Sequence, residues 1–208
     1  MKVARNLFAQ FKTTLILKNQ ISIYKSSVFL FLLLLTVVGC ALPFNRNLTP
    51  EEQVAVVTTD KGIFVFEFYP DAAPVAVDNF IKLINMKFYD GLTFHRKVDA
   101  PGLNIIQGGC PKGDGTGGPG WNIVDEYTNP NQRPHVKGTV AMARANAPNS
   151  AGSQFYICFK PQPHLDGHYT TFGGVVQGMD VVDRLEIDDV MTRIRLEAKS
   201  KYVKATTE

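Results

Sequence analysis

Short β-branched and aromatic runs, separated by glycine-, asparagine- and proline-rich turns, recur along most of this 208-residue chain. This pattern is typical of β-strands, and the strands we expect cover residues 54–59, 63–68, 92–97, 104–107, 135–143, 153–159, 171–176 and 194–204. Helical spacing appears in only two segments, a longer one from Pro74 to about residue 87 and a short one at residues 179–185. Because strands and helices do not alternate, the sequence predicts a mainly antiparallel barrel or sandwich.

The first 40 residues differ in charge from the rest of the chain. They contain no acidic residue and five cations, namely Lys2, Arg5, Lys12, Lys18 and Lys25. The 22 cations of the whole chain less these five leave 17 against 19 acidic residues, so the net charge of +3 becomes −2. The basic balance therefore belongs to the N-terminal segment, and we expect no nucleic-acid-binding surface in the remainder.

An apolar run at residues 28–38 follows this basic segment. The run is shorter than the roughly 20 apolar residues that span a membrane, which is typical of an export signal. It ends in Val-Val-Gly-Cys at residues 37–40, which resembles the lipobox of bacterial lipoproteins, where the cysteine is lipidated and becomes the mature N-terminus. We therefore expect an exported protein, periplasmic or otherwise extracytoplasmic, that a lipid on Cys40 tethers to the membrane. An uncleaved signal anchor, soluble export and a translation start after Met1 stay open as alternatives.

The composition divides the chain into three parts. Residues 1–40 form the signal peptide of lipoprotein type, or the anchor. Residues 41–53 predict a flexible tether, because turn-forming residues recur there at Pro43, Asn45, Asn47, Thr49 and Pro50. Residues 54–204 carry the periodic patterns and are long enough for one folded domain with its own core.

The cysteines and histidines of the folded domain do not form a metal-binding pattern. Cys110 and Cys158 have neither CxxC nor zinc spacing, and the apolar run around Cys158 favours a buried free thiol, although a disulfide formed after export stays open. His164 and His168 are four apart, but the Asp-Gly between them predicts a turn and no third ligand is suggested. Ser153 has no neighbouring base. We therefore expect no nucleophilic catalysis, no metal and no cofactor.

Two further polar segments carry weaker signals. Residues 108–120 contain seven glycines but lack the Gly-Lys-Ser/Thr ending of a P-loop. They therefore predict a tight loop with positive φ angles rather than a phosphate-binding loop. The adjacent acids Asp125 and Glu126 are expected to be solvated loop charges rather than a general acid and base.

The strongest candidate site combines one cation with two amide side chains. Arg96 lies in a predicted strand, Gln107 follows it eleven residues later, and Gln154 lies in a second glycine-containing segment. Adjacent strand residues point to opposite faces, so if Arg96 faces a cleft, His95 faces inward as a hydrogen-bonded structural histidine. A charge and two amides with apolar neighbours, but without a nucleophile–base pair, suit a reaction in which no covalent bond is made or broken.

These motifs resemble the cyclophilin family of peptidyl-prolyl cis-trans isomerases. The matching segments run in order over roughly residues 54–200, at 79–80, 89–96, 107–109, 115–120, 138–144, 148–157, 165–167 and 172–173. The resemblance implies a mainly β fold, an eight-stranded antiparallel barrel capped by two α-helices, with a hydrophobic groove on its outer face. It also implies an enzyme that rotates X–Pro peptide bonds without a cofactor or a metal.

The resemblance assigns roles to individual residues. The family's catalytic arginine falls on Arg96, and the glutamine that helps orient the substrate carbonyl falls on Gln107. Peptide contacts and groove walls fall on Ala143, Arg144, Gln154, Tyr156, Leu165 and Tyr169. His164 stands where the family has the tryptophan that contacts cyclosporin, so weak sensitivity to that drug is expected, and Cys110 stands where the family has an aspartate.

The segment between Arg96 and Gln107 departs from the family pattern. The family has a phenylalanine there on the floor of the proline pocket. This chain is a few residues longer and has Leu103 or Asn104 at that position, with Ile105 at the neighbouring aliphatic position. Loss of the ring removes apolar contact worth about 1–3 kcal/mol of substrate binding.

Two functions fit this sequence. The first is a monomeric prolyl isomerase that assists the folding of exported proteins, with unfolded or partly folded chains containing X–Pro bonds as its partners. The second is a non-catalytic module that binds a proline-containing peptide within an envelope or membrane-associated complex, which the altered pocket floor motivates. Retention of Arg96, Gln107 and Gln154 favours the isomerase.

Overall fold

Residues 47–203 are described in the computed structural model of this chain. Within them, eight strands form one sheet in the order β3-β4-β6-β5-β7-β2-β1-β8, with antiparallel pairing throughout. The strands are β1 Gln53–Thr59, β2 Gly62–Phe68, β3 Phe94–Ala100, β4 Leu103–Gly108, β5 Thr139–Met142, β6 Phe155–Cys158, β7 Thr171–Gln177 and β8 Met191–Ala198. The helices of this part are α2 Pro74–Asn85, α3 Met179–Asp183 and the 3-10 helices η1 Pro50–Glu52, η2 Pro163–Leu165 and η3 Lys199–Lys201.

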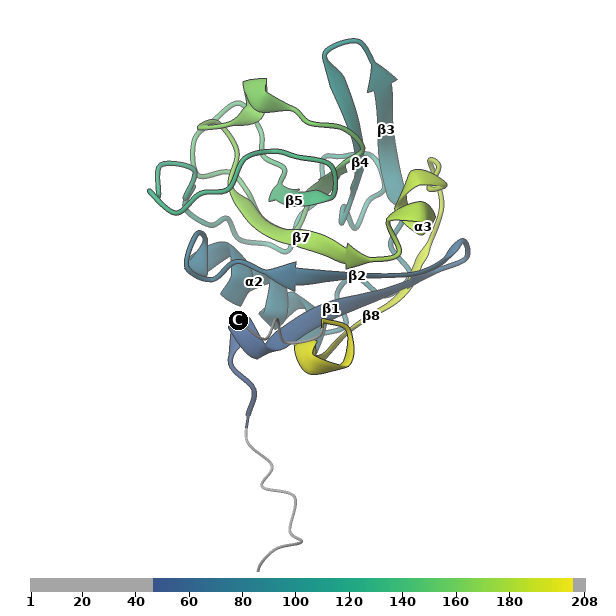
Figure 1. Cartoon of the computed structure of the whole chain (residues 1–208). Helices are drawn as coiled ribbons and strands as arrows, with labels where there is room; N and C mark the ends of the chain where they lie inside the picture. Colours follow the sequence, from purple (N-terminus) through teal and green to yellow (C-terminus); the bar gives the residue numbers. More distant parts are fainter. Residues whose placement is uncertain (1–46, 204–208) are drawn as a thin grey trace, which may run out of the picture. The chain divides into compact units, whose positions relative to one another are not determined.

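The sheet curves into a half-barrel whose edge strands are β3 and β8. An isolated bridge between Thr93 and Val190 joins the starts of these two strands, and the N–H of Phe94 donates to the carbonyl of Asp189 at 3.0 Å. Figure 1 shows β3 and β4 rising as a hairpin at one end of the fold, whereas β1, β2 and β8 lie at the other. The predicted fold, mainly β with eight antiparallel strands and two α-helices, is confirmed.

Side-chain alternation gives the central strands two apolar faces. On β4 and β6, Ile106 and Ile157 belong to the large inner core, whereas Ile105, Tyr156 and Cys158 belong to a smaller cluster. Neighbouring residues of a strand point to opposite faces, so this smaller cluster lies on the outside of the half-barrel. We call it the outer cluster, and it comprises Val98, Leu103, Ile105, Ala141, Ala143, Tyr156, Cys158, Leu165 and Tyr169.

Phe80 on α2 is a central member of the inner core. Its ring centroid lies 5.5 Å from that of Phe66 and 5.3 Å from that of Phe155, in edge-to-face contacts, and 4.7 Å from that of Tyr89, in a stacked one. All four rings are fully buried. Aromatic pairs of this kind add about 0.5–1.5 kcal/mol beyond the burial of their area. These contacts fix helix α2 against the inner face of the half-barrel. The outer cluster lies on the opposite face.

Helix α2 begins at Pro74, which suits the first helical turn because proline has no N–H to leave unpaired. The next two N–H groups, of Val75 and Ala76, donate to the two carboxylate oxygens of Glu126 at 3.0 and 2.9 Å. Glu126 lies in a loop, as predicted, but it is half-buried and hydrogen-bonded rather than simply solvated. Its negative charge caps the positive end of the helix dipole from a distant loop.

Two predicted strands differ from those observed. The strand predicted at residues 135–143 is shortened to β5, because the N–H of His135 donates to the side chain of Asp166 at 2.8 Å instead of to a strand. The strand predicted at residues 194–204 corresponds to β8, which begins earlier and gives way to η3. At the first place a loop contact, and at the second a 3-10 helix, stands where the apolar pattern alone would favour strand pairing.

The N-terminal segment lies largely outside the described residues. The predicted signal peptide with Cys40 and the predicted tether up to residue 46 are not among them. At the C-terminal end, Lys204, the last residue of the predicted domain, also lies outside the described residues. The last residues of the predicted tether form η1, where the N–H of Thr49 donates to the carboxylate of Glu52 at 3.0 Å, and lead into β1. Among residues 47–203, no helix is long and apolar enough to cross a membrane.

Candidate active site

A cavity of about 150 Å³ opens over the outer cluster. Its lining combines polar side chains of β3 and β4 with apolar walls, and consists of Arg96, Leu103, Ile105, Gln107, Ala143, Arg144, Tyr156, Leu165 and Tyr169. All of these are residues that the sequence predicted for the site, although they come from strands and loops far apart in the chain. The fold therefore brings the predicted cation, one predicted amide and the predicted walls into one concave surface.

Three predicted site residues, Asn104, Gln154 and His164, do not line this cavity. The alternation of β4 points Leu103 and Ile105 toward the cavity, whereas Asn104 is buried and its Nδ2 donates to a backbone carbonyl of β3 at 2.9 Å. His164 lies exposed on η2, outside the cavity lining. Of the two candidates for the floor position, the structure therefore selects Leu103.

A chain of hydrogen bonds through two glutamines joins Arg96 to the glycine-rich loop. Arg96 Nη1 donates to Gln107 Oε1 at 3.0 Å, and Gln107 Nε2 donates to Gln154 Oε1 at 2.9 Å. Gln154 Nε2 in turn donates to the carbonyls of Gly115 and Gly117 at 2.7 and 2.9 Å. Because both amides are held at each end, the guanidinium is anchored on one side and fixed in direction.

The guanidinium of Arg96 keeps an uncompensated positive charge. Within the described part of the chain it forms no ion pair, and its bond to Gln107 is its one hydrogen bond. The residue is exposed at the edge of the cavity. A guanidinium has five N–H donors in a fixed fork, so Arg96 retains donors for a bound molecule.

The prediction that His95 is hydrogen-bonded is wrong. A register shift between Phe94 and Arg96 interrupts the regular alternation of β3. The ring of His95 lies against Gly115 of the glycine-rich loop, and its two nitrogens are buried without a hydrogen-bond partner among residues 47–203. Burial lowers the pKa of His95, which favours the neutral ring under the loop.

The glycine-rich loop at residues 108–120 is tight, as predicted. Gly109 has a φ of +85°, and a Cβ there would lie 2.5 Å from the carbonyl oxygen of Ser153, so only glycine fits. Cys110 Sγ accepts the N–H of Gly117 at 3.2 Å. This bond helps to fix the segment whose carbonyls hold Gln154.

Both cysteines of the folded domain are buried free thiols, as the apolar run around Cys158 predicts. Burial raises the pKa of Cys158 to about 12. Burial also raises the pKa of Cys110, but backbone N–H groups of the glycine-rich loop outweigh this effect and lower it. Among residues 47–203, no group of three or more potential ligands could hold a metal ion.

A second cavity of about 280 Å³ adjoins the first. Gln107, Ala143 and Arg144 line both cavities, and the glycine-rich loop and Gln154 line only the second. The second cavity therefore extends the first one past the two glutamines that anchor Arg96. It leaves room on that side for further residues of a bound peptide.

Arg144 lines both cavities, and other groups of the protein hold its side chain in place. Its Nη1 and Nη2 donate to the carbonyls of Ala145 and His168, each at 3.0 Å, and its Nε lies 3.7 Å from Asp125 Oδ2. The guanidinium also lies 5.1 Å from the ring centroid of Tyr169. The prediction that Asp125 is solvated is wrong, because its side chain is only 7% exposed.

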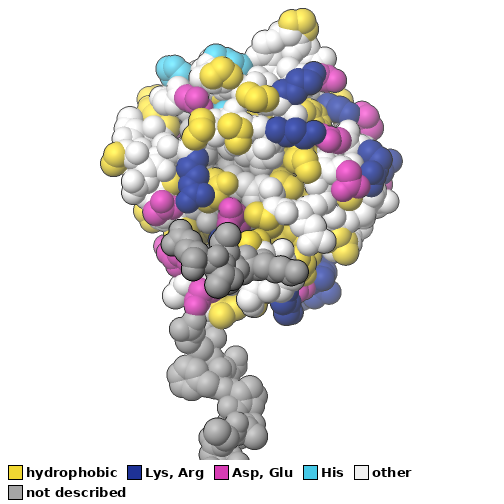
Figure 2. All heavy atoms as spheres, in the orientation of Figure 1, with side chains coloured by type: hydrophobic (Ala, Val, Ile, Leu, Met, Phe, Trp, Pro, Cys, Tyr) yellow, Lys and Arg dark blue, Asp and Glu magenta, His cyan; other side chains and the backbone are white. Residues whose placement is uncertain are grey.

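Charged side chains are interspersed on the face drawn in Figure 2, where acidic and basic groups neighbour one another. This face shows no extended area of one sign. The picture agrees with the net charge of −2 that remains when the N-terminal cations are set apart, as 17 cations against 19 acidic residues. Nothing on this face points to a polyanionic ligand.

Sequence analysis missed the polar contacts behind Tyr156. Its hydroxyl lies 2.9 Å from Nε2 of His135, which in turn contacts Asp166. One signal was present: a tyrosine in an otherwise apolar strand needs a partner for its hydroxyl when it is buried. The identity of that partner depends on loops that the periodicity of the sequence does not describe.

Comparison with known proteins supports one family throughout. The family described as cyclophilin type peptidyl-prolyl cis-trans isomerase/CLD matches residues 54–206. The peptidyl-prolyl cis-trans isomerase B of Bacillus subtilis is 50% identical over 132 residues, which cover 64% of this chain and 89% of that protein. A peptidyl-prolyl cis-trans isomerase of Synechococcus elongatus is 53% identical over 119 residues, 57% of this chain and 77% of that protein.

A solved structure supports the same assignment. The cyclophilin type isomerase of Cryptosporidium parvum, determined in the presence of the dipeptide Ala-Pro, superimposes with a TM-score of 0.64 and 30% identity, covering 70% of this chain and 99% of that one. Together with the half-barrel, the cavity over its outer cluster and the anchored Arg96, these matches show that the chain belongs to the cyclophilin family of peptidyl-prolyl cis-trans isomerases.

Proposed function

We propose that Arg96 is the catalytic group of this isomerase and that it acts on X–Pro bonds of proteins that fold outside the cytoplasm. The observation that carries this proposal is the unpaired guanidinium of Arg96, which Gln107 holds at the edge of an apolar cavity. The dipeptide used with the Cryptosporidium relative supports an X–Pro unit as the ligand of such a cavity.

The barrier to X–Pro rotation comes from amide resonance. Partial double-bond character gives a barrier of about 18–20 kcal/mol, so uncatalysed exchange takes on the order of tens to hundreds of seconds. In the twisted transition state the prolyl nitrogen loses conjugation and regains its lone pair. A donor aimed at that nitrogen stabilises the twisted amide more than the planar one, and it thereby lowers the barrier.

Each part of the cavity has a role in this reaction. The apolar walls, including Tyr156 and Leu165, enclose the prolyl ring. Arg96 donates to the prolyl nitrogen through N–H groups that Gln107 does not occupy, and Gln107 retains a second Nε2 hydrogen for a substrate carbonyl. Arginine stays charged throughout, so no proton is exchanged with the substrate.

The N-terminal segment supports exported proteins as the substrates. Residues 1–40 have the basic and apolar order of an export signal, and Cys40 is the proposed lipid attachment site. A lipid there would tether the isomerase, through residues 41–53, on the periplasmic or extracytoplasmic side of a membrane. Exported chains whose folding waits for slow X–Pro rotation would then be its clients.

A second candidate function is a peptide-binding module without turnover. It is favoured by Leu103, which lines the cavity where the family has a phenylalanine and leaves less apolar contact for the prolyl ring. Such a module would hold one proline-containing segment of a resident envelope or membrane-associated partner. The anchored Arg96 favours the isomerase over this alternative.

An NMR exchange assay on short X–Pro peptides tests the catalytic proposal. The unmodified chain should accelerate isomerisation, and Arg96→Ala should lower kcat/KM by about 10²–10³, the loss expected when one preorganised donor to a transition state is removed. The melting temperature should stay unchanged, because this exposed side chain makes a single hydrogen bond. Full activity in Arg96→Ala would contradict the mechanism. Peptide binding without turnover by the folded, unmodified chain would favour the binding module.

Fractionation of cells tests the proposed location. The unmodified chain should be found with the membrane after export, and Cys40→Ala should remove the lipid and change processing of the N-terminal segment. Incorporation of a labelled fatty acid into the unmodified chain, but not into Cys40→Ala, would support the lipoprotein. Membrane association without any incorporated lipid would favour the uncleaved anchor.

A further inference from the structure

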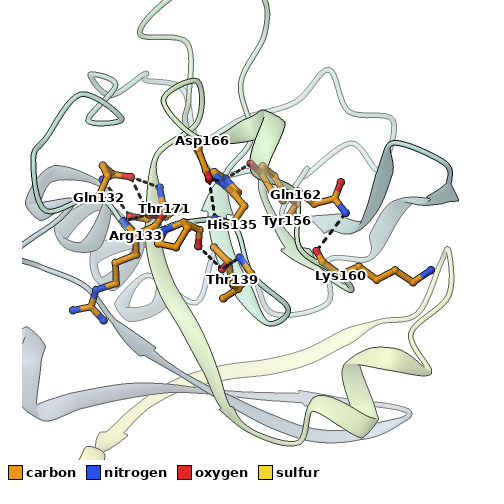
Figure 3. Close-up of polar contacts among 11 residues, drawn as sticks. Gln132, Arg133, His135, Thr139, Tyr156, Lys160, Gln162, Asp166 and Thr171 are labelled. Atoms are coloured by element: carbon orange, nitrogen blue, oxygen red, sulfur yellow. Dashed lines mark hydrogen bonds and ion pairs between the residues drawn. The ribbon is translucent and has the colours of Figure 1, made fainter.

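Three side chains form a hydrogen-bonded row behind the wall of the first cavity (Figure 3). The hydroxyl of Tyr156 lies 2.9 Å from His135 Nε2, and His135 Nδ1 lies 2.7 Å from Asp166 Oδ1. His135 is only 2% exposed and Tyr156 only 3%. The row starts on β6, passes through the loop before β5 and ends directly after η2, so it joins three segments that are distant in sequence.

Asp166 fixes the direction of these hydrogen bonds. Its Oδ1 also accepts the backbone N–H of His135 at 2.8 Å. Burial raises the pKa of this carboxyl, but the hydrogen bonds from His135 outweigh burial and lower it. An ionised carboxylate only accepts, so we assign the proton of His135 to Nδ1. Burial lowers the pKa of His135, and the neutral ring leaves Nε2 as the acceptor for the Tyr156 hydroxyl.

The row determines how two walls of the cavity are presented. The ring of Tyr156 lies nearly parallel to that of His135, with centroids 6.0 Å apart and the hydrogen bond between them, and meets the ring of Tyr169 edge-to-face at 5.9 Å. Because its hydroxyl is bound by His135, Tyr156 offers its ring carbons to the cavity. Leu165, a second wall residue, directly precedes Asp166, so the same carboxylate restrains both walls.

We propose that His135 and Asp166 are positioning residues of the isomerase, which hold Tyr156 and Leu165 so that they enclose the prolyl ring, and thereby set the affinity for the substrate without touching it. This inference rests on the proposed use of the cavity for X–Pro peptides. Arg96 has its own anchor through Gln107. The row should therefore affect binding of the prolyl ring more than the rate of its rotation.

A pH dependence of peptide binding follows from the row. The other titratable or charged groups that act on His135 and Tyr156 are His164, Cys158, Tyr169 and Arg144. Protonation of His135 turns Nε2 into a donor to the hydroxyl oxygen of Tyr156, so the bond reverses and, in the described part of the chain, the hydroxyl hydrogen is left without an acceptor. The affinity for the peptide should therefore fall as the pH falls through the pKa of His135.

The test measures affinity and rate separately on the full-length chain in detergent, with an Ala-Pro-containing peptide followed by NMR. His135→Asn keeps an N–H for Asp166 but loses the acceptor for Tyr156, and Tyr156→Phe removes the hydroxyl. Each should weaken binding about threefold to tenfold, while the exchange rate at saturating peptide stays within about twofold. The double variant should bind no more weakly than the weaker single variant, because both changes remove the same bond. Binding by Tyr156→Phe should also lose its dependence on the pKa of His135.

Gln132→Ala is the matched control. Gln132 also forms polar contacts in Figure 3, since its Nε2 donates to the carbonyl of Ala72 at 2.9 Å and its Oε1 accepts the N–H of Thr171 at 2.8 Å, but it lines neither cavity. This variant should lose stability and keep its affinity. If His135→Asn behaves in the same way, His135 is merely structural and the proposal is overturned.

The same data separate this inference from the proposed catalysis. Binding without exchange by the unmodified chain would overturn the catalytic role of Arg96 but leave the affinity comparison intact. A folded, unmodified chain that binds no X–Pro peptide would overturn both proposals. Weaker binding in His135→Asn, with unchanged affinity in Gln132→Ala, would support the positioning role.

Discussion

Arg96 and Arg144 line the same cavity, but the protein treats their charges differently. Arg96 is exposed, and among residues 47–203 its side chain makes one hydrogen bond, to the neutral amide of Gln107. The side chain of Arg144 is only 15% exposed, lies near the carboxylate of Asp125 and donates to the backbone carbonyls of Ala145, Asn146 and His168. A position beside the cavity therefore does not by itself leave an arginine with free donors. The proposed mechanism requires the free donors and unpaired charge that Arg96 keeps.

The surroundings of Arg144 explain what its charge does instead. Asp125 also accepts the N–H of Asn149 at 2.8 Å, and the guanidinium of Arg144 lies near the ring of Tyr169. The arginine thus joins the loops that separate the two cavities. Arg144 therefore joins parts of the protein to one another, whereas Arg96 keeps the free donors on which the proposed mechanism depends.

Gln107→Glu should have the largest effect, because it would remove the difference in charge pairing between Arg96 and Arg144. The new carboxylate would pair with Arg96, so that Arg96 would resemble Arg144, and it would also lose the N–H that binds Gln154. We expect kcat/KM to fall by about 100-fold, comparable to the removal of a transition-state donor. Gln107→Ala, which removes the amide without adding a charge, serves as the control in the same exchange assay and should lose less. Equal losses in the two variants would mean that pairing the charge of Arg96 does not matter.

Arg144→Ala tests the other half of the comparison. Removal of the guanidinium leaves the nearly buried Asp125 without its cation and three backbone carbonyls without this donor. Denaturant titration should show a loss of about 1–3 kcal/mol in the free energy of unfolding. Arg133→Ala is the control, because Arg133 pairs with Asp71 at 3.4 Å on the surface, where about half of each side chain is exposed. That surface pair is worth at most about 1 kcal/mol, so a larger loss in Arg133→Ala than in Arg144→Ala would contradict this account.

The smallest effect concerns two histidines, the half-buried His95 and the buried His135. Burial lowers the pKa of His95, beside Arg96, and of His135, behind Tyr156. The unfolded chain therefore binds more protons than the folded one below the ordinary histidine pKa, about 6.5, and stability is lost as the pH falls from there toward the lowered pKa values. The pH slope of the melting temperature between about pH 7 and pH 5 should be smaller in His95→Asn and in His135→Asn than in the unmodified chain. An unchanged slope in both would show that neither histidine is responsible.

The sequence predicted much of the fold and most of the lining of the cavity. Alternating and apolar runs indicated the strands, and the resemblance to cyclophilins assigned Arg96, Gln107 and Gln154 to one site, where hydrogen bonds join them. Such predictions succeed because strand periodicity is a local property of the sequence, and because a family motif assigns several neighbouring residues together.

The errors occurred where contacts link distant loops. Glu126 caps α2, and Asp166 holds His135, across separations that no periodicity encodes. His95 was predicted wrongly because a register shift in β3 is not visible in the alternation of residue types. These contacts depend on where loops meet after folding, which a single sequence does not state.

The most direct test of the central claim compares Arg96→Ala with Arg144→Ala in one exchange experiment at saturating X–Pro peptide, where differences in binding no longer contribute. The account predicts that Arg96→Ala loses most of the catalysed rate and keeps the melting temperature of the unmodified chain. Arg144→Ala should keep a rate within about threefold, because a residue outside the transition-state contacts affects binding and stability rather than turnover. A loss of rate in Arg144→Ala as large as in Arg96→Ala would contradict the claim that Arg96 alone supplies the catalytic charge.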